Sequence, residues 1–338
     1  TLPGGLRSLA AGRRVRAQPL RTRGTASLQP VVVGVDTGGT FTDLVWLDGA
    51  TPRVHKVPST PHDPSLAIRT GLAELLGERA ASEVIHGTTV ATNAVLEGKI
   101  APTALVTNAG LEDVIEIGRQ DRPDLYDLFQ TRPAPPVPRA LRFGVRGRLG
   151  PHGERVERLD EGALRALVPA ITASGARAIA IVFLHSYANP ADEERAARIL
   201  ARTGLPITSS ARLCPEFREY ERTTTTALNA ALVPVMAGYL ARLDAAVGTA
   251  RLSIMHSAGG MTSAARAAER PIETVLSGPA GGVAAAESLG RALGLTRLIT
   301  FDMGGTSTDV ALIDGHARLA STTCIAGWPV KMPVLDIH

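Results

Sequence analysis

Cysteine and aromatic residues are scarce in this sequence. Only two cysteines occur among 338 residues, Cys214 and Cys324, and neither belongs to a Cys-X-X-Cys pair. Their small number and wide separation exclude a disulfide scaffold and are typical of a reducing compartment, so we expect a cytoplasmic location. Aromatic side chains make up 4% of the chain, whereas all hydrophobic residues make up 44%. The core is therefore expected to consist mainly of Ala, Val, Leu and Ile.

Long apolar runs and a one-sided charge are also lacking outside the first 30 residues. No stretch of about 18 or more consecutive apolar residues occurs, so no membrane span is expected. The net charge of +4 comes from residues 1–30, which hold six arginines and no acid, whereas the remainder carries 30 basic and 32 acidic residues. No basic patch is interleaved with aromatic residues, so nucleic acid is not an expected partner. We expect residues 1–30 to form a disordered basic leader, and a mitochondrial targeting segment is the alternative.

Strand-like and helix-like patterns alternate along the rest of the chain, which predicts an α/β fold. Residues 121–138 are rich in Pro and Asp and should form a loop. A helical stretch over residues 220–246 is expected to pause at Pro234, because proline lacks the N–H donor. Other expected elements are helices over residues 63–76, 110–117, 161–173 and 190–202, and strands over residues 104–107, 142–149, 178–183 and 252–256.

One pattern occurs twice, at a constant offset. Residues 31–49 read VVVGVDTGGTFTDLVWLDG, and residues 297–315 read RLITFDMGGTSTDVALIDG. Each copy has an apolar strand, Asp-X-Gly-Gly-Thr, a Thr-Asp pair, a second apolar strand and Asp-Gly. Glycine pairs between two strand-like runs predict two β-hairpins.

The chemistry of these turns favours phosphate binding. Glycine lets the backbone approach a ligand closely, and exposed amides and Thr hydroxyls donate to phosphate oxygens. Asp36 and Asp302 end the first strand of each copy, and a carboxylate beside a phosphate requires a divalent cation such as Mg²⁺ between them. A single copy would be ordinary turn chemistry, whereas two matched copies can hold one phosphate chain. The candidate phosphate-binding residues are Thr37, Gly38, Gly39, Thr40, Thr42, Gly304, Gly305, Thr306 and Thr308.

Further candidates lie outside the hairpins. Gly278 and Gly281 belong to the segment 277–282, which opens a helix whose N-terminal amides can face a nucleotide. His86 and Thr88 follow a strand and are candidate substrate contacts, although a helix cap and a satisfied histidine explain them equally well. Arg119 and Arg122 lie in a charged loop.

Two levels of resemblance follow from these motifs. The repeated hairpin resembles the actin, sugar kinase and Hsp70 ATPase superfamily. Over roughly residues 31–338, the chain is similar to the hydantoinase A/5-oxoprolinase family, which includes N-methylhydantoinase and acetone carboxylase type subunits. The motifs that carry this second resemblance are HGTTVATNAVLEGK (86–99), DVIEIGRQDRPDLYDL (113–128), PEFREYERTTTTALNAAL (215–232), MHSAGGM (255–261), ETVLSGPAGGV (273–283) and ITFDMGGTSTDV (299–310).

The resemblance implies a fold and a domain organisation. The fold would be α/β, with duplicated actin-like (ribonuclease H-like) ATPase domains whose mixed sheets are flanked by helices. Residues 31–210 would form the hydantoinase/oxoprolinase N-terminal domain. Residues 211–338 would form the first part of the hydantoinase A domain, because the family pattern continues beyond a DIH like the one at 336–338. We therefore expect weak or absent ATPase activity from this chain alone.

The resemblance also implies an activity, which is ATP- and Mg²⁺-dependent hydrolysis of a cyclic amide such as a hydantoin or 5-oxoproline. Phosphoryl transfer from ATP to the substrate oxygen would precede attack by water. Two alternatives remain open: the ATP-binding subunit of an acetone-type carboxylase, and a non-catalytic nucleotide-binding or assembly module. A hydantoinase B-type companion subunit and a homo-oligomer are the implied partners.

The family's roles map onto named residues of this sequence. Asp36 and Asp302 would hold the metal and act in catalysis, together with Asp309. Asp43 and Asp309 would orient water or support the hairpin, and turn capping explains both equally well. The four candidates for substrate contacts are His86, Thr88, Arg119 and Arg122. For the two arginines, a solvated loop of ion pairs is the structural alternative.

Overall fold

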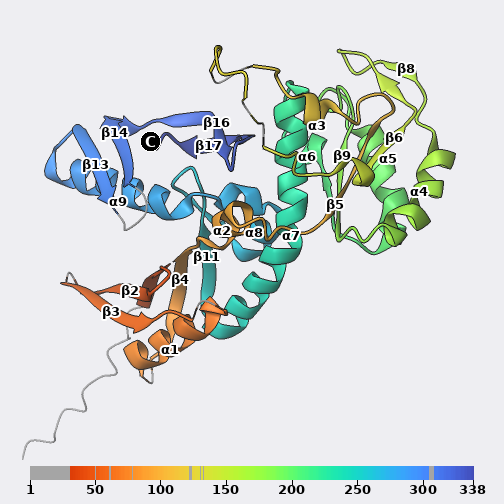
Figure 1. Cartoon of the computed structure of the whole chain (residues 1–338). Helices are drawn as coiled ribbons and strands as arrows, with labels where there is room; N and C mark the ends of the chain where they lie inside the picture. Colours follow the sequence, from red (N-terminus) through yellow and green to blue (C-terminus); the bar gives the residue numbers. More distant parts are fainter. Residues whose placement is uncertain are drawn as a thin grey trace, which may run out of the picture. The chain divides into compact units, whose positions relative to one another are not determined.

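A six-stranded mixed sheet carries the first hairpin. The computed structural model that shows this sheet describes residues 31–49, 51–60, 62–77, 79–121, 124–129, 131, 133–303 and 308–338 (Figure 1). The strand order is β12-β11-β4-β1-β2-β3, in which β4 runs parallel to β1 and β11 parallel to β4, while the other neighbours are antiparallel. The six strands are β1 (Val31–Thr37), β2 (Phe41–Asp48), β3 (Thr51–Pro58), β4 (Ala81–Gly87), β11 (Arg251–Met255) and β12 (Met261–Ser263).

Helices cover this sheet through one continuous apolar core. Val33 and Val35 of β1 and Leu44 of β2 are buried in it. Gly71 lets a helix approach the sheet, because a Cβ at this position would lie 2.5 Å from a methyl group of Leu44. The helices with buried residues in this core are α1 (Pro64–Leu76), α2 (Val90–Leu96), α7 (Glu219–Val247) and α8 (Ala264–Glu269).

A second sheet has four parallel strands in the order β10-β9-β5-β6. Both of its faces are buried, which fits the continuous apolar sequence of its central strands. On β9, Ile179 and Ile181 pack with residues of α4 and α5, whereas Ala178 and Ala180 pack with α7. The elements of this region are β5 (Thr103–Asn108), β6 (Arg142–Val145), β9 (Ala178–Val182), β10 (Ile207–Ser209), α3 (Val114–Ile117), α4 (Glu161–Ala173), α5 (Ala191–Leu200) and α6 (Ser210–Leu213).

Helix α7 contacts both sheets and is buried around much of its circumference. Its four consecutive threonines, residues 223–226, are buried, and each hydroxyl is satisfied by donating to the carbonyl four residues earlier. The predicted pause at Pro234 is wrong, since the helix continues to Val247. Proline removes a single N–H donor, and the buried Leu232 and Met236 on either side hold the helix in the core.

By length and composition alone, α7 could cross a membrane, and it is the one helix in the described part of the chain for which this holds. The count of consecutive apolar residues gave no sign of this. The helix packs against β9, β17 (Trp328–Leu335) and α1, and 39% of its most apolar window is buried. The helix also buries Glu221, Arg222 and Asn229, which is the behaviour of a core helix with paired polar groups.

The C-terminal region contains the second hairpin. Helix α9 (Ser277–Leu293) packs on a three-stranded antiparallel sheet, and a two-stranded sheet follows. A small core of Ala280, Val283, Ala311, Ile313 and Leu335 joins them. The strands are β13 (Arg297–Met303), β14 (Thr308–Asp314), β15 (His316–Ala317), β16 (Leu319–Ile325) and β17 (Trp328–Leu335).

Mixed sheets flanked by helices are thus confirmed, with some changes in element bounds. The expected helix over residues 110–117 is confined to Val114–Ile117, and the expected strand over 142–149 is interrupted between β6 and β7. The predicted domain boundary lies after residue 210. Strands from both sides of this boundary share the six-stranded sheet, and residues 31–338 form one unit by their contacts. The predicted basic leader, residues 1–30, lies outside the described residues. The remaining elements are β7 (Arg148–Leu149), β8 (Arg155–Glu157) and the 3₁₀ turns Arg139–Leu141, Ala201–Thr203 and Pro271–Thr274.

Candidate functional site

The two copies of the repeated pattern form hairpins with the same register. In the first, Asp36 stands opposite Asp43 across β1 and β2. In the second, Asp302 stands opposite Asp309 across β13 and β14. The repetition is therefore structural as well as sequential. Of the predicted phosphate-binding residues in the second turn, Thr308 begins β14, whereas Gly304, Gly305 and Thr306 lie outside the described residues.

The turn of the first hairpin is held closed by hydrogen bonds. The amide of Gly38 donates to the carbonyl of Phe41 at 3.0 Å. A Cβ on Gly38 would lie 3.2 Å from that same carbonyl oxygen, so a larger residue would crowd the turn. Ser59 supports the turn from outside: its hydroxyl donates to the Gly38 carbonyl at 2.7 Å and lies 3.0 Å from Thr42 Oγ1, and its amide donates to the Thr40 carbonyl. No sequence signal pointed to Ser59.

The carboxylates of the two hairpins act on each other electrostatically. Asp36 retains exposed surface, but protein atoms partly enclose its carboxyl group, and this loss of hydration raises its pKa. The negative charges of Asp43 and Asp302 raise the pKa further, while a hydrogen bond from the amide of Thr37 acts in the opposite direction. Asp43 is itself paired with Lys56 at 2.8 Å. A divalent cation would relieve the repulsion between Asp36 and Asp302, as the prediction of shared metal binding requires.

Two carboxylates do not make a complete metal site. Within the described ranges, no cluster of three or more His, Cys, Asp or Glu side chains could hold a metal ion. Mg²⁺ commonly keeps several waters and binds through one or two carboxylates plus phosphate oxygens. The pair formed by Asp36 and Asp302 fits that kind of site and not a site made of protein ligands alone.

A cavity of about 590 Å³ lies beside the first turn. Thr37 Oγ1 is buried and has no hydrogen-bond partner, which holds for no other buried side-chain nitrogen or oxygen in the described part of the chain. A buried hydroxyl without a partner is costly unless a ligand or water satisfies it. The donor set, rich in hydroxyls and basic groups, fits a phosphate-bearing ligand at this turn. The polar residues that line the cavity are Thr37, Ser59, Thr60, His62, Thr88, Thr89, Asn93, Glu97, Lys99, Tyr239 and Arg242.

His86 lies behind this cavity and does not line it. Its side chain is fully buried, its Nε2 is 2.5 Å from Tyr239 Oη, and its Nδ1 is 3.3 Å from the Val35 carbonyl. Burial lowers the pKa of His86 to about 4, against a smaller opposite effect of the hydrogen bond to Val35. His86 is therefore neutral at physiological pH. Direct contact with a substrate stays a prediction for His86, whereas its partner Tyr239 does line the cavity.

Thr88 combines a structural role with a place in the cavity wall. Its hydroxyl accepts a hydrogen bond from the amide of Val90 at 3.2 Å, at the start of α2. Its backbone carbonyl accepts from Ser277 Oγ at 3.0 Å, so the start of α9 is fastened to the loop after β4. Both the capping and the site interpretation of Thr88 are compatible with this arrangement.

Comparison with protein families covers most of the sequence. Residues 32–204 match the hydantoinase/oxoprolinase N-terminal region, and residues 222–338 match the hydantoinase/oxoprolinase domain. The chain belongs to the hydantoinase/oxoprolinase family. The family resemblance inferred from the repeated hairpin and the other motifs is thereby confirmed.

Several hydantoinase/oxoprolinase relatives have names that state an activity. The chain is 37% identical to caprolactamase subunit alpha of Pseudomonas jessenii, in an alignment that covers 92% of this chain. It is 34% identical to a 5-oxoprolinase of Pestalotiopsis fici, in an alignment that covers 90% of this chain. The crystal structure of the ATP-dependent caprolactamase matches with a TM-score of 0.83 at 34% identity over 91% of this chain. The nucleotide-free structure of acetone carboxylase matches with a TM-score of 0.81 at 30% identity over 91% of this chain.

This hydantoinase/oxoprolinase chain is shorter than those relatives. It spans 48% of the caprolactamase subunit and 27% of the oxoprolinase, and 47% and 48% of the two crystallised chains. Most of the sequence outside residues 1–30 is nevertheless aligned in every case. The match therefore establishes the family and the α/β fold.

The two glycines predicted at the start of α9 have different surroundings. A Cβ on Gly281 would lie 3.1 Å from Met255 Sδ, so this glycine makes room for packing against β11. Around Gly278 the nearest atom to such a Cβ is a methyl group of Thr89, at 4.0 Å. Thr89 lines the cavity beside the first turn, so Gly278 lies close to its wall. Nucleotide contact stays a prediction for both.

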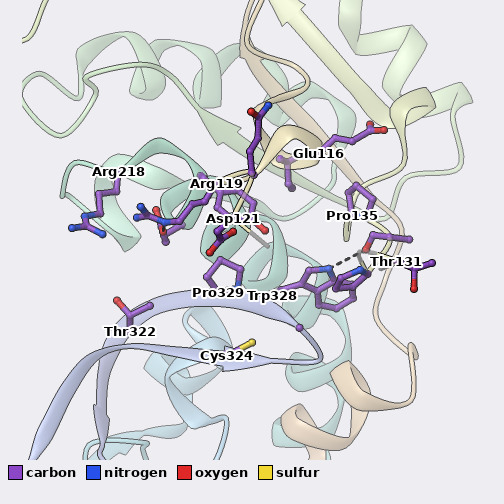
Figure 2. A pocket seen from close by; sticks show the side chains of 18 of the residues that line it. Glu116, Arg119, Asp121, Thr131, Pro135, Arg218, Thr322, Cys324, Trp328 and Pro329 are labelled. Atoms are coloured by element: carbon purple, nitrogen blue, oxygen red, sulfur yellow. Dashed lines mark hydrogen bonds and ion pairs between the residues drawn. The ribbon is translucent and has the colours of Figure 1, made fainter. Parts of the chain in front are cut away.

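Arg119 lines a second cavity of this protein, with a volume of about 970 Å³ (Figure 2). Its Nε donates to the buried carboxylate of Glu221, and Asp121 and Arg218 also line the cavity. Figure 2 shows Arg119 and Asp121 around the same cavity as Trp328 and Pro329 of the β16–β17 hairpin. The Trp328 indole donates to the Ala134 carbonyl at 2.9 Å. The predicted substrate contacts are thus separated: Arg119 lines one cavity and Thr88 the other. Arg122 lies outside the described residues.

The neutral state of His86 has a consequence for stability. A histidine whose pKa is lowered in the folded protein binds its proton more readily when unfolded. Stability is then complete above about pH 6.5 and falls, by up to about 1.4 kcal/mol per pH unit, as the pH drops towards 4. We expect His86→Gln to flatten this slope in urea titrations, and His152→Gln, at an exposed loop position, to leave it unchanged. Equal slopes for the wild type and His86→Gln would contradict the assignment.

Proposed function

We propose that the protein uses ATP to open a cyclic amide of the hydantoin, 5-oxoproline or caprolactam type. One observation carries the proposal: two hairpins of identical register bring Asp36 and Asp302 within electrostatic reach of each other. The names of the caprolactamase and oxoprolinase relatives support the choice of a cyclic amide as substrate. Participation of a hydantoinase B-type companion subunit is part of the proposal, since the caprolactamase relative is itself a subunit.

Each group of the site then has a task. The amides of the first turn and Thr37 Oγ1, which lacks a partner, would donate to phosphate oxygens, and Thr308 would do so from the second hairpin. Asp36 and Asp302 would hold the Mg²⁺ with its water shell. When bound, ATP with Mg²⁺ supplies a transferable phosphoryl group, which activates an otherwise unreactive amide oxygen. Asp309, opposite Asp302 in the register, is the candidate for orienting water.

ADP release in the presence of a panel of ring compounds tests the proposal. With Mg²⁺ and the companion subunit, we expect hydantoin, 5-oxoproline or caprolactam to raise ADP release about tenfold or more over the rate without a ring compound. The ring-opened amino acid or carbamoyl product should appear in a one-to-one ratio with ADP. Nucleotide binding with no ring compound accelerating its turnover would favour a non-catalytic module instead.

An acetone-type carboxylase is the second candidate. The specific observation in its favour is that the acetone carboxylase structure matches this chain almost as well as caprolactamase, with TM-scores of 0.81 and 0.83. Acetone and bicarbonate therefore belong in the same panel. ADP release that requires both of them, and no ring compound, would select the carboxylase and reject the amidase.

A further inference from the structure

The cavity beside the first turn contains a hydrogen-bond relay whose polarity is set by the backbone. His86 stands opposite Val35 in the parallel pairing of β4 with β1, and its Nδ1 lies 3.3 Å from the Val35 carbonyl oxygen. A carbonyl oxygen can only accept a hydrogen bond. The hydrogen of a neutral His86 therefore lies on Nδ1, and Nε2 is left as an acceptor.

The polarity of His86 decides the direction of the next hydrogen bond. Nε2 lies 2.5 Å from Tyr239 Oη, and since Nε2 carries no hydrogen, the Tyr239 hydroxyl must donate to it. The phenol has one hydrogen, so its oxygen can offer only lone pairs elsewhere. Burial raises the pKa of Tyr239, and a hydrogen bond with the Thr88 side chain acts in the opposite direction; because the phenol hydrogen is used by His86, Tyr239 is the acceptor of that bond.

Tyr239 is 2% exposed, yet it lines the 590 Å³ cavity. Two lone pairs are available on its oxygen, and the Thr88 hydroxyl occupies one of them. A ligand that contacts the other lone pair must present a donor, because a ligand oxygen at that position would face a second acceptor. A ligand that presents an N–H group is therefore favoured over a ring of the same size that presents an oxygen.

We propose that this cavity binds the cyclic amide next to the phosphate-binding turn, and that Tyr239 is a specificity-determining residue that accepts the ring N–H. His86 is then a positioning residue, which acts on the ligand only through Tyr239. The inference rests on the proposed function for the class of substrate. It goes further because it separates lactams from lactones and ketones, which lack the N–H.

A matched pair of ligands tests the specificity. We expect the wild-type chain to bind 2-pyrrolidinone about tenfold or more tightly than γ-butyrolactone, in which an oxygen replaces the N–H, measured by calorimetry or ligand-observed NMR without nucleotide. Tyr239→Phe should reduce this preference to within about threefold. Tyr126→Phe removes the same hydroxyl from a tyrosine that is 88% exposed and outside the cavity, so it should keep the preference.

The tautomer of His86 is a second and independent readout. In protein labelled with ¹⁵N-histidine, we expect His86 to show a protonated Nδ1 and an unprotonated Nε2 at neutral pH. This measurement needs only the wild type, so it remains decisive if Tyr239→Phe does not fold. A protonated Nε2 would overturn the inference, because Tyr239 would then be the acceptor of that bond and free to donate into the cavity.

The binding outcomes separate this inference from the proposed function. Failure of both rings to bind at millimolar concentration, equal affinity for the two rings, or a preference that survives in Tyr239→Phe overturns the role of Tyr239. A lactam preference that depends on Tyr239, in the absence of lactam-dependent ADP release, supports the inference and rejects ATP-driven ring opening. Lactam-dependent ADP release with an unchanged preference in Tyr239→Phe does the opposite.

Discussion

Arg222→Met is expected to lower the free energy of unfolding by about 3–5 kcal/mol, because it leaves a buried carboxylate without its counter-ion. Arg222 and Glu193 are both fully buried, 3.6 Å apart. The guanidinium also donates to Glu219 at 2.6 Å, to the Phe183 carbonyl at 2.6 Å and to Ser210 Oγ at 2.7 Å. Methionine fills a similar volume but offers no donor. Urea denaturation at neutral pH measures the loss.

A surface arginine provides the matched control. Arg212 is 74% exposed and lies 3.5 Å from Glu194 on α5, so Arg212→Met should change stability by no more than about 0.5 kcal/mol. The double replacement Arg222→Met with Glu193→Met removes both buried charges but leaves the amides of Phe183 and Ala211 without their acceptor, so it should recover only part of the loss. If Arg222→Met were as mild as Arg212→Met, the buried pair would contribute little to the link between α5 and α7.

Arg222 also illustrates how far local sequence reasoning reaches. Its pairing with Glu219 follows from a spacing of three residues on one helix and could be expected. Its pairing with Glu193 joins α5 to α7 and depends on how β9 and β10 place those helices. Spacing along the chain carries no information on such a contact. For the same reason, the sequence division after residue 210 could not show that β11 pairs with β4 in one sheet.

The candidate site was predictable where it is local and repeated. Both hairpins could be read directly, because their registers depend on neighbouring residues. The cavity beside the first turn is assembled from the β1–β2 turn, α1, α2 and α7, so Tyr239 carried no signal as part of a site. His86 and Arg119 were grouped by their chemistry alone, and the fold separates them because Arg119 is fastened to Glu221 at the start of α7.

The carboxylates of the hairpins support the prediction with the largest expected effect on ligand binding. Asp36→Asn and Asp302→Asn should each weaken Mg²⁺–nucleotide binding about 10- to 100-fold, the loss typical of impaired metal sites. Calorimetry with a non-hydrolysable nucleotide, with and without Mg²⁺, measures the effect apart from turnover. Without Mg²⁺ the difference between wild type and variants should disappear or reverse, because each substitution then removes a negative charge that repels phosphate.

Asp36→Asn should act in the opposite direction on the ligand-free protein. Partial burial and the charges of Asp43 and Asp302 raise the pKa of Asp36, so at neutral pH the ionised carboxylate disfavours the folded state. Asp36→Asn should therefore raise the melting temperature while it weakens Mg²⁺–nucleotide binding. Asp48→Asn is the control, since Asp48 ends the same hairpin at an exposed position paired with Arg53 at 3.6 Å. If Asp36 and Asp302 bind a cation between them, Asp36→Asn must raise the melting temperature of the ligand-free protein and lower the affinity for Mg²⁺–nucleotide. If the hairpin is only a relic of duplication, Asp36→Asn will leave that affinity and its dependence on Mg²⁺ unchanged.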